Sequence, residues 1–254
     1  MNALVRVLSL PAVILSKVPG IGPIIRACCT SVGQKVLMAL TGLSLSGFLV
    51  AHLSGNFLLY AGEAEFNAYA EKLHSLGPLL VAAEIGLFGM FLLHIGLAIS
   101  TIAMNRAARA RSYDMKDSKQ SNLILPGGAS SWMVVTGVLI GIFLVCHLLD
   151  LKFKWFVGDG SSGWSPVAYS DTSNEFYSVV NVLSDPLHAV IYSIGFIALG
   201  IHLSHGVRSA LQSLGLSHPR WDGLLKFLGY AFAWAIAAGF LSLIMWVFAF
   251  APDV

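Results

Sequence analysis

Charged side chains are scarce in this 254-residue sequence: they make up 11% of it, whereas a soluble domain usually carries about 25%. The net charge is only +2, so we expect no nucleic-acid partner, since binding to phosphates needs a strongly basic surface. The three cysteines, Cys28, Cys29 and Cys146, form no C-x-x-C pair and predict no disulfide framework. Hydrophobic residues make up 56% of the chain, which is the composition of a multi-pass membrane protein.

Five apolar stretches are each long enough to cross about 30 Å of hydrocarbon as an α-helix. We expect these spans at roughly the following residues: 35–60, 78–104, 131–151, 186–213 and 224–250. Lipid offers the backbone no hydrogen-bond partner, so each span must be helical. The predicted fold is therefore an all-α, membrane-embedded bundle of five transmembrane helices at residues 31–254, preceded by a surface or interfacial segment at residues 1–30.

The basic residues predict the orientation of this bundle. Lysine and arginine are concentrated before the first span, after the second and after the fourth, whereas the other two loops carry most of the acidic residues. Cytoplasmic loops are enriched in lysine and arginine. The pattern therefore predicts that the N-terminus lies inside and the C-terminus outside.

Two of the apolar spans carry nearly the same stretch, TGLSLSGFLVAHL at residues 41–53 and TGVLIGIFLVCHL at residues 136–148. Each stretch begins with Thr-Gly and has a histidine ten positions after that glycine. A histidine inside a bilayer is costly and usually has a partner or a cofactor. For one such histidine alone, a hydrogen-bonded packing role would be the more common explanation.

Four histidines in the spans share a relation of depth that packing alone does not predict. His52 and His147 lie about 16 residues into spans that run outward, and His94 and His202 lie about 16 residues into spans that run inward, which is about 24 Å from each helix start. They therefore form an outer and an inner level, roughly 15–18 Å apart before helix tilt is considered. Two imidazoles at one level suit the axial positions of a haem iron.

Other uses of the histidines fit less well. Zinc would need four clustered ligands, and the two levels separate these side chains. A proton relay would combine histidine with carboxylates, of which Glu84 is the only clear mid-span example. Small residues at matching positions before the outer histidines, Gly42 with Ser46 and Gly137 with Gly141, would let either helices or a flat macrocycle approach closely.

At this point the sequence resembles the di-haem cytochrome b membrane anchor of succinate dehydrogenases and fumarate reductases, of the single-polypeptide, five-helix type. The resemblance covers roughly residues 31–250. It rests on the two stretches above and on the motifs AEIGLFGMFLLHIGLA, FLVCHLLD and HLSHGVRSALQSLG. The last motif ends without the tryptophan that the family usually has there. The resemblance implies that His52 and His147 bind one b-type haem and that His94 and His202 bind the other.

The resemblance also implies the partners. A flavoprotein subunit with FAD holds the dicarboxylate site, an iron–sulfur subunit relays electrons, and both dock on the cytoplasmic face, with a dimer of the whole complex as a further arrangement. This chain would exchange electrons with a quinone, for which menaquinone is expected, in the bacterial cytoplasmic membrane. The sequence itself carries no Rossmann fingerprint or iron–sulfur cysteine spacing, as a subunit that binds no dicarboxylate should not. It does not distinguish succinate oxidation from fumarate reduction.

Two alternatives stay open. The chain could be the di-haem cytochrome b of another quinone-linked enzyme, such as nitrate reductase, formate dehydrogenase or hydrogenase. It could also be a transporter or a structural anchor without haem.

Four further residues are candidates for the site. Glu84, near the outer end of the second span, is a candidate for proton transfer to a quinone, or else a carboxylate bonded to a neighbouring helix. We interpret His188 as a partner of an outer haem propionate or of the quinone rather than as an axial ligand. His205 is interpreted as a polar neighbour or propionate partner of the inner haem. Arg208 is either a propionate partner or a topology determinant.

Overall fold

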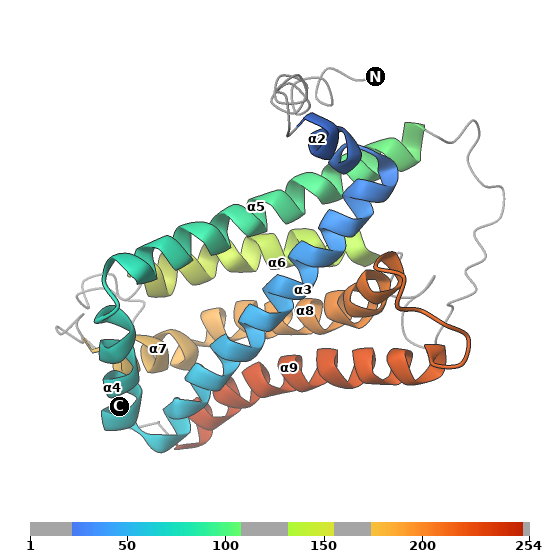
Figure 1. Cartoon of the computed structure of the whole chain (residues 1–254). Helices are drawn as coiled ribbons and strands as arrows, with labels where there is room; N and C mark the ends of the chain where they lie inside the picture. The colour runs from blue at the N-terminus through green and yellow to red at the C-terminus, as the bar shows by residue number, and fades with distance from the viewer. Residues whose placement is uncertain (1–21, 108–131, 155–173, 251–254) are drawn as a thin grey trace.

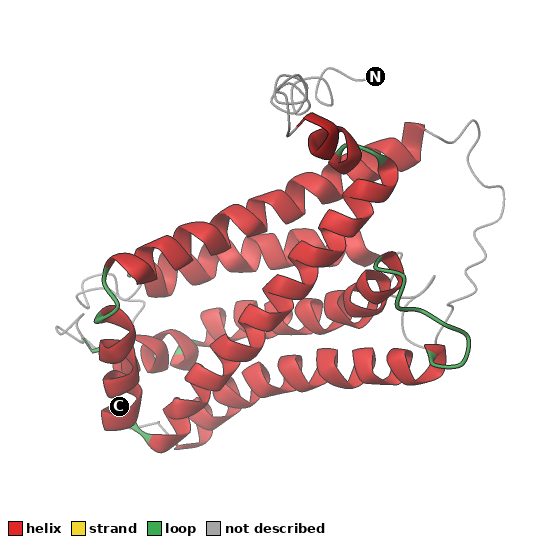
Figure 2. Ribbon diagram, in the orientation of Figure 1, coloured by secondary structure: helices red, strands yellow, loops and turns green. Residues whose placement is uncertain are grey.

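The computed structural model describes residues 22–107, 132–154 and 174–250. These residues are almost entirely helical, and none of them belongs to a strand (Figure 2). The all-α prediction is therefore confirmed for the described part of the chain. Of the predicted interfacial segment, the structure describes residues 22–30, which contain the short helix α2 (Gly22–Cys28).

Five helices are long and apolar enough to cross a membrane. They are α3 (Ser31–Asn56) with the 3₁₀ turn η1 (Phe57–Ala61), α5 (Pro78–Ala107), α6 (Met133–His147) with the π-helical turn η3 (Leu148–Lys152), α8 (Pro186–Ser213) and α9 (Asp222–Phe250). The predicted spans agree with these bounds to within a few residues. The composition and length support a multi-pass membrane protein, and the orientation of the bundle stays a prediction.

Local sequence explains where two of these helices begin. Thr30 lies just before α3 in an extended conformation, and its hydroxyl accepts a hydrogen bond from Gly33 N at 3.0 Å. Asp185 caps α8 in the same way, and Pro186 follows it at the first helical position, where no amide hydrogen is needed.

Helix α8 is the centre of the bundle and packs against α9, α6 and α3, whereas α5 packs mainly on α3 (Figure 1). A Cβ atom at Gly195 of α8 would lie 2.5 Å from the ring of Phe143, so this glycine allows α6 and α8 to approach closely. Along α5 only Leu97 is buried, and many large apolar side chains are exposed. Such an apolar surface is expected of a helix that faces lipid.

Two short helices that were not predicted, α4 (Glu63–His74) and α7 (Glu175–Ser184), lie together at one end of the bundle (Figure 1). We call this the α4–α7 end. His74 is the last residue of α4. A search for long apolar runs overlooks such helices. Acidic residues in the first turn of α4 and basic residues in its last turn were the available signal.

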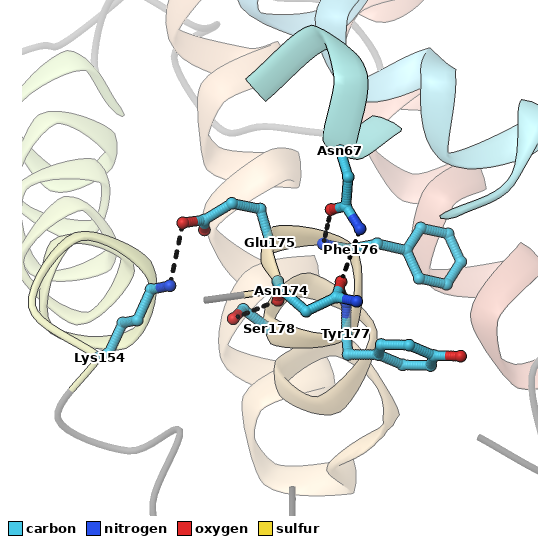
Figure 3. Close-up of polar contacts among 7 residues, drawn as sticks. All are labelled: Asn67, Lys154, Asn174, Glu175, Phe176, Tyr177 and Ser178. Atoms are coloured by element: carbon cyan, nitrogen blue, oxygen red, sulfur yellow. Dashed lines mark hydrogen bonds and ion pairs between the residues drawn. The ribbon is translucent and has the colours of Figure 1, made fainter. Parts of the chain in front are cut away.

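Asparagine side chains join these two helices (Figure 3). Asn67 of α4 donates through Nδ2 to Asn174 Oδ1 at 2.9 Å and accepts the backbone N–H of Phe176 at 3.0 Å. Asn174 Oδ1 also caps α7 by accepting from Tyr177 N at 3.2 Å. Lys154 donates to Glu175 at 3.0 Å, which ties the chain beyond α6 to the start of α7. The α4–α7 end is thus fixed by polar contacts between segments far apart in sequence.

Candidate functional site

The four histidines meet in two pairs across the bundle. The rings of His52 on α3 and His147 on α6 have centroids 5.8 Å apart. The rings of His94 on α5 and His202 on α8 have centroids 6.5 Å apart. Each pair joins two different helices, and α9 contributes no histidine. The first pair lies near the α4–α7 end, because His147 is the last residue of α6.

The separations suit two axial ligands of one metal. With a metal–imidazole nitrogen distance of about 2.0–2.1 Å, two imidazoles on opposite sides of a metal have centroids about 6 Å apart. Both observed separations are close to this value. Among the described residues, no group of three or more His, Cys, Asp or Glu side chains could hold a bare metal ion. Each pair therefore offers a metal two nitrogen ligands, which is the donor set of a bis-histidine haem.

Threonine hydroxyls hold both histidines of the second pair. Thr41 Oγ1 lies 3.0 Å from His94 Nδ1, and Thr136 Oγ1 lies 3.1 Å from His202 Nδ1. These are the threonines that open the two similar stretches of sequence. The contacts were not predicted, and the recurrence of Thr-Gly was the signal that could have suggested them.

The threonine contacts also favour one tautomer of each imidazole. The Thr41 hydroxyl donates to the carbonyl of Leu37 at 2.9 Å, so its oxygen remains to accept a hydrogen from His94 Nδ1. The Thr136 hydroxyl donates to Trp132 O at 2.9 Å and can accept from His202 in the same way. With hydrogen on Nδ1, the neutral ring carries its free lone pair on Nε2, as a metal ligand requires.

The glycine after each threonine makes room for the same histidine. A Cβ atom at Gly42 would lie 3.3 Å from His94 Cε1, and one at Gly137 would lie 3.6 Å from His202 Cε1. Gly42 thus lets the ring of His94 lie directly against α3. Ser46, one turn further on, turns inward and donates to the carbonyl of Gly42 at 2.8 Å. At Gly141, by contrast, a Cβ atom would meet no described atom within 4 Å.

The two levels of histidines are therefore built from the same two stretches. His52 follows Thr41 by eleven positions and His147 follows Thr136 by eleven, which is about 16 Å of helix. Each stretch places its own histidine in one pair and, through its threonine, supports a histidine of the other pair.

Aromatic side chains surround the pair formed by His52 and His147. The ring of Phe48 stacks on His52 with centroids 5.3 Å apart, and Tyr192 packs edge-on against His147 at 5.9 Å. Asn56 Nδ2 lies 3.5 Å from both ring nitrogens of His52. His147 Nδ1 is buried and has no hydrogen-bond partner among the described residues. An unpaired buried nitrogen is costly, so His147 is suited to ligand binding.

The other predicted residues have partners of their own. Lys152 Nζ donates a hydrogen bond to Glu84 Oε1 at 2.5 Å and forms an ion pair with it. This contact joins α5 to η3, and both side chains are exposed. Arg208 Nη2 bonds both carboxylate oxygens of Asp222 at 3.0 and 3.2 Å, which joins α8 to α9. His205 lies about one turn after His202 on α8 and is partly buried.

His188 lies in the first turn of α8, between two carboxylates. Its Nδ1 is 2.7 Å from Asp185 Oδ1, and its Nε2 is 3.5 Å from Asp150 Oδ1. Asp150 is fully buried in η3, and Tyr192 donates to its other oxygen at 2.9 Å. Asp150, the last residue of the motif FLVCHLLD, was not among the predicted site residues. The feature of the sequence that could have indicated Asp150 is a carboxylate at the end of an apolar span.

Comparison of the chain with models of protein families, with curated proteins and with solved structures finds no match.

Proposed function

We propose that this chain is the membrane-anchor and electron-transfer subunit of a succinate:quinone oxidoreductase, in which two b-type haems are each held between two histidines. The observation that carries the proposal is the pairing of His52 with His147 and of His94 with His202 at centroid separations of 5.8 and 6.5 Å. The resemblance of the motifs around these histidines supports the choice of enzyme.

In the proposed site, different residues would bind the metal, orient its ligands and exclude water. The four histidines would bind the two irons, and Thr41 and Thr136 would orient His94 and His202 with Nε2 toward the metal. Phe48, the ring that stacks on His52, and its aromatic neighbours would exclude water from the other pair. Bound haem supplies reversible one-electron transfer, and with both axial positions filled it is unsuited to oxygen chemistry.

The charge distribution supports the proposed orientation and partners. Arg26 of α2, Lys35 of α3 and Arg106 of α5 lie at the end of the bundle opposite the α4–α7 end, whereas α4 carries Glu63 and Glu65 in its first turn (Figure 1). By the positive-inside rule, the basic end faces the cytoplasm, in a bacterial cytoplasmic membrane. A flavoprotein subunit with FAD and an iron–sulfur subunit would dock there, and the His52–His147 pair would lie toward the outer surface.

Quinone, as menaquinone, would exchange electrons near the outer pair. Glu84 is the proposed proton donor or acceptor for this exchange, because its carboxylate lies near the same end of the bundle on α5. In that role, the ion pair with Lys152 would hold the carboxylate in place. His205 and Arg208 stay candidates for interaction with the propionates of the inner haem, and His188 for the outer one.

Haem quantitation on the purified protein and on single His→Ala variants tests the proposal. We expect two b-type haems in the wild type. His52→Ala and His147→Ala should lose the same haem, and His94→Ala and His202→Ala should lose the other. His218→Ala is the matched control, because His218 lies outside the spans and its ring accepts a hydrogen bond from Arg220 N in the same turn. It should retain both haems.

The outcomes also separate the alternatives. A wild-type protein without a b-type band in its reduced-minus-oxidised spectrum would be a transporter or a structural anchor, and the proposal would be wrong. Two haems together with a co-purifying flavoprotein that oxidises succinate or reduces fumarate would support it. Two haems with a different catalytic subunit would assign the chain to another quinone-linked enzyme.

A further inference from the structure

A fully buried carboxylate lies at the α4–α7 end, close to the His52–His147 pair. Asp150 has no exposed surface, and its two carboxylate oxygens differ in their hydrogen bonds. Oδ2 accepts a hydrogen bond from Tyr192 at 2.9 Å, whereas Oδ1 has no hydrogen bond among the described residues. Burial of an ionised carboxylate is costly unless a positive charge or several donors compensate it. Asp150 must therefore either carry a proton or face a protonated neighbour.

The neighbour that faces Asp150 is His188. Its Nε2 lies 3.5 Å from Asp150 Oδ1, and its Nδ1 lies 2.7 Å from Oδ1 of Asp185. The side chains of His188 and Asp185 are 16% and 14% exposed, whereas that of Asp150 is 0% exposed. The three groups thus form a line that leads from the edge of the bundle to its interior.

The geometry assigns the hydrogen on Nδ1 of His188. Asp185 Oδ1 already accepts the backbone N–H of His188 at 2.9 Å, so it acts as an acceptor toward the ring as well. Burial by itself would raise the pKa of Asp185, but the hydrogen bonds from the backbone and ring of His188 outweigh it and hold the pKa below its ordinary value. Asp185 is therefore ionised at neutral pH.

Two protonation states of the pair then remain. Either Asp150 is protonated and faces the bare Nε2 of His188, or His188 carries both ring hydrogens and faces ionised Asp150. They differ by the transfer of one proton across a gap of 3.5 Å. Both states avoid an uncompensated buried charge, so a proton can enter through His188 and rest on Asp150.

Tyr192 connects this pair to the proposed redox site. Its hydroxyl donates to Asp150, and its ring packs against the ring of His147 with centroids 5.9 Å apart. An electron added next to His147 in a medium of low dielectric constant raises the affinity of nearby groups for a proton.

We propose that Asp185, His188 and Asp150 form a proton-transfer relay. Before reduction, His188 carries both ring hydrogens and faces ionised Asp150; when the site at His52 and His147 gains one electron, His188 passes its Nε2 proton to Asp150 and takes one proton from water in its place. On oxidation the electron leaves that site and the proton returns through His188 to water, so charge and protons balance in each direction. This inference rests on the proposed function, because a haem held by His52 and His147 would hold the electron, which the iron–sulfur subunit or the quinol would supply.

Among the described residues, the two lysines near the relay are paired with carboxylates outside it. Lys152 pairs with Glu84 and Lys154 pairs with Glu175, whereas the thiol of Cys146 interacts with Tyr192, which bonds Asp150. The relay is also no cation site, because the described residues contain no group of three His, Cys, Asp or Glu side chains that could hold a metal ion.

The test combines redox titration and infrared difference spectroscopy on the full-length protein in lipid nanodiscs. In the wild type, we expect the reduction potential of the outer haem to fall by up to about 59 mV for each unit by which the pH rises, which corresponds to a tenfold change in the equilibrium constant of a one-electron couple. The potential of the inner haem should change less. Reduction should also produce a band of a protonated carboxyl group. Asp150→Asn should abolish both effects at the outer haem, and His188→Gln should slow proton uptake while the carboxyl band remains.

Asp222→Asn is the matched control, because it removes an ion-paired carboxylate from the start of α9, and it should keep both effects. Loss of the effects in Asp150→Asn but not in Asp222→Asn supports the relay. A wild type with two haems but with neither a pH-dependent potential nor a carboxyl band overturns the relay and leaves the proposed function intact, even if a variant fails to fold.

Pure protein without haem would refute the proposed function. Infrared spectra recorded at two pH values would then decide about the proton site alone: a carboxyl band that changes with pH and is absent from Asp150→Asn supports it, and its absence from the wild type overturns it.

Discussion

The hydroxyl of Thr41 offers a sharp test of how the histidines are oriented. Replacement of Thr41 by valine exchanges the hydroxyl for a methyl group and removes the acceptor for His94 Nδ1. The side chain of Thr41 is almost fully buried, so water cannot readily replace the lost hydrogen bond. A buried donor without a partner costs about 1–3 kcal/mol, and outer-shell partners of metal ligands are typically worth about 10–100-fold in metal affinity.

We therefore expect Thr41→Val to bind the inner haem about 10–100-fold more weakly. The outer haem should be unaffected, although Thr41 belongs to the same stretch as its ligand His52. Thr41→Ser is the matched control, because it keeps the hydroxyl, and Thr136→Val should reproduce the effect through His202. The measurement is the rate at which each haem is lost to an excess of a haem-scavenging protein.

Equal loss of both haems in Thr41→Val would refute the assignment of the threonine to the inner level. Unchanged retention of both haems would show that the contact with Nδ1 does not orient the ligand.

Three further predictions concern other parts of the bundle. Glu84→Gln should lower quinone-linked turnover without loss of haem, and Lys152→Gln, which breaks the same ion pair but keeps the carboxylate, should retain more of it; equal turnover in both variants would reduce Glu84 to a structural partner. Gly195→Ala should lower the free energy of unfolding by about 1–3 kcal/mol in a thermal denaturation assay, because a Cβ atom would lie 2.5 Å from the ring of Phe143, and an unchanged midpoint would show that α6 moves aside. Asp185→Ala should lower the free energy of unfolding by about 1 kcal/mol at neutral pH, because it removes the cap of α8. Since the pKa of Asp185 is lowered in the folded protein, this stabilisation should be present above the unfolded pKa of 3.8 and should vanish as the pH falls through the lower folded pKa. A difference in stability between wild type and variant that grows in acid would contradict the prediction.

The long helices could be predicted from the sequence because the thickness of the hydrocarbon layer dictates their length. The helices α4 and α7 could not be predicted in that way, since they are short and partly polar. What fixes them is a hydrogen bond from Asn67 to Asn174 and another from the backbone N–H of Phe176 to Asn67, across more than a hundred residues of sequence. No pattern within either helix indicates that contact.

The candidate site shows the same division. The positions of His52, His94, His147 and His202 along their spans predict two levels from the sequence alone. In the sequence, each Thr-Gly pair is associated with the histidine that follows it in the same stretch, His52 or His147. In the structure, Thr41 contacts His94 instead, because eleven helical residues carry it away from the level of His52.

The sequence by itself thus determined which long segments are helical, roughly where they begin and end, and how far along its helix each histidine lies, since hydrophobicity and the rise per residue are properties of one helix at a time. Tertiary structure alone decided which threonine supports which histidine, and that Asp150 is buried beside His188 and Tyr192. Those contacts depend on how neighbouring helices rotate and cross, and rotation is set by side-chain packing between helices rather than by the sequence of either one.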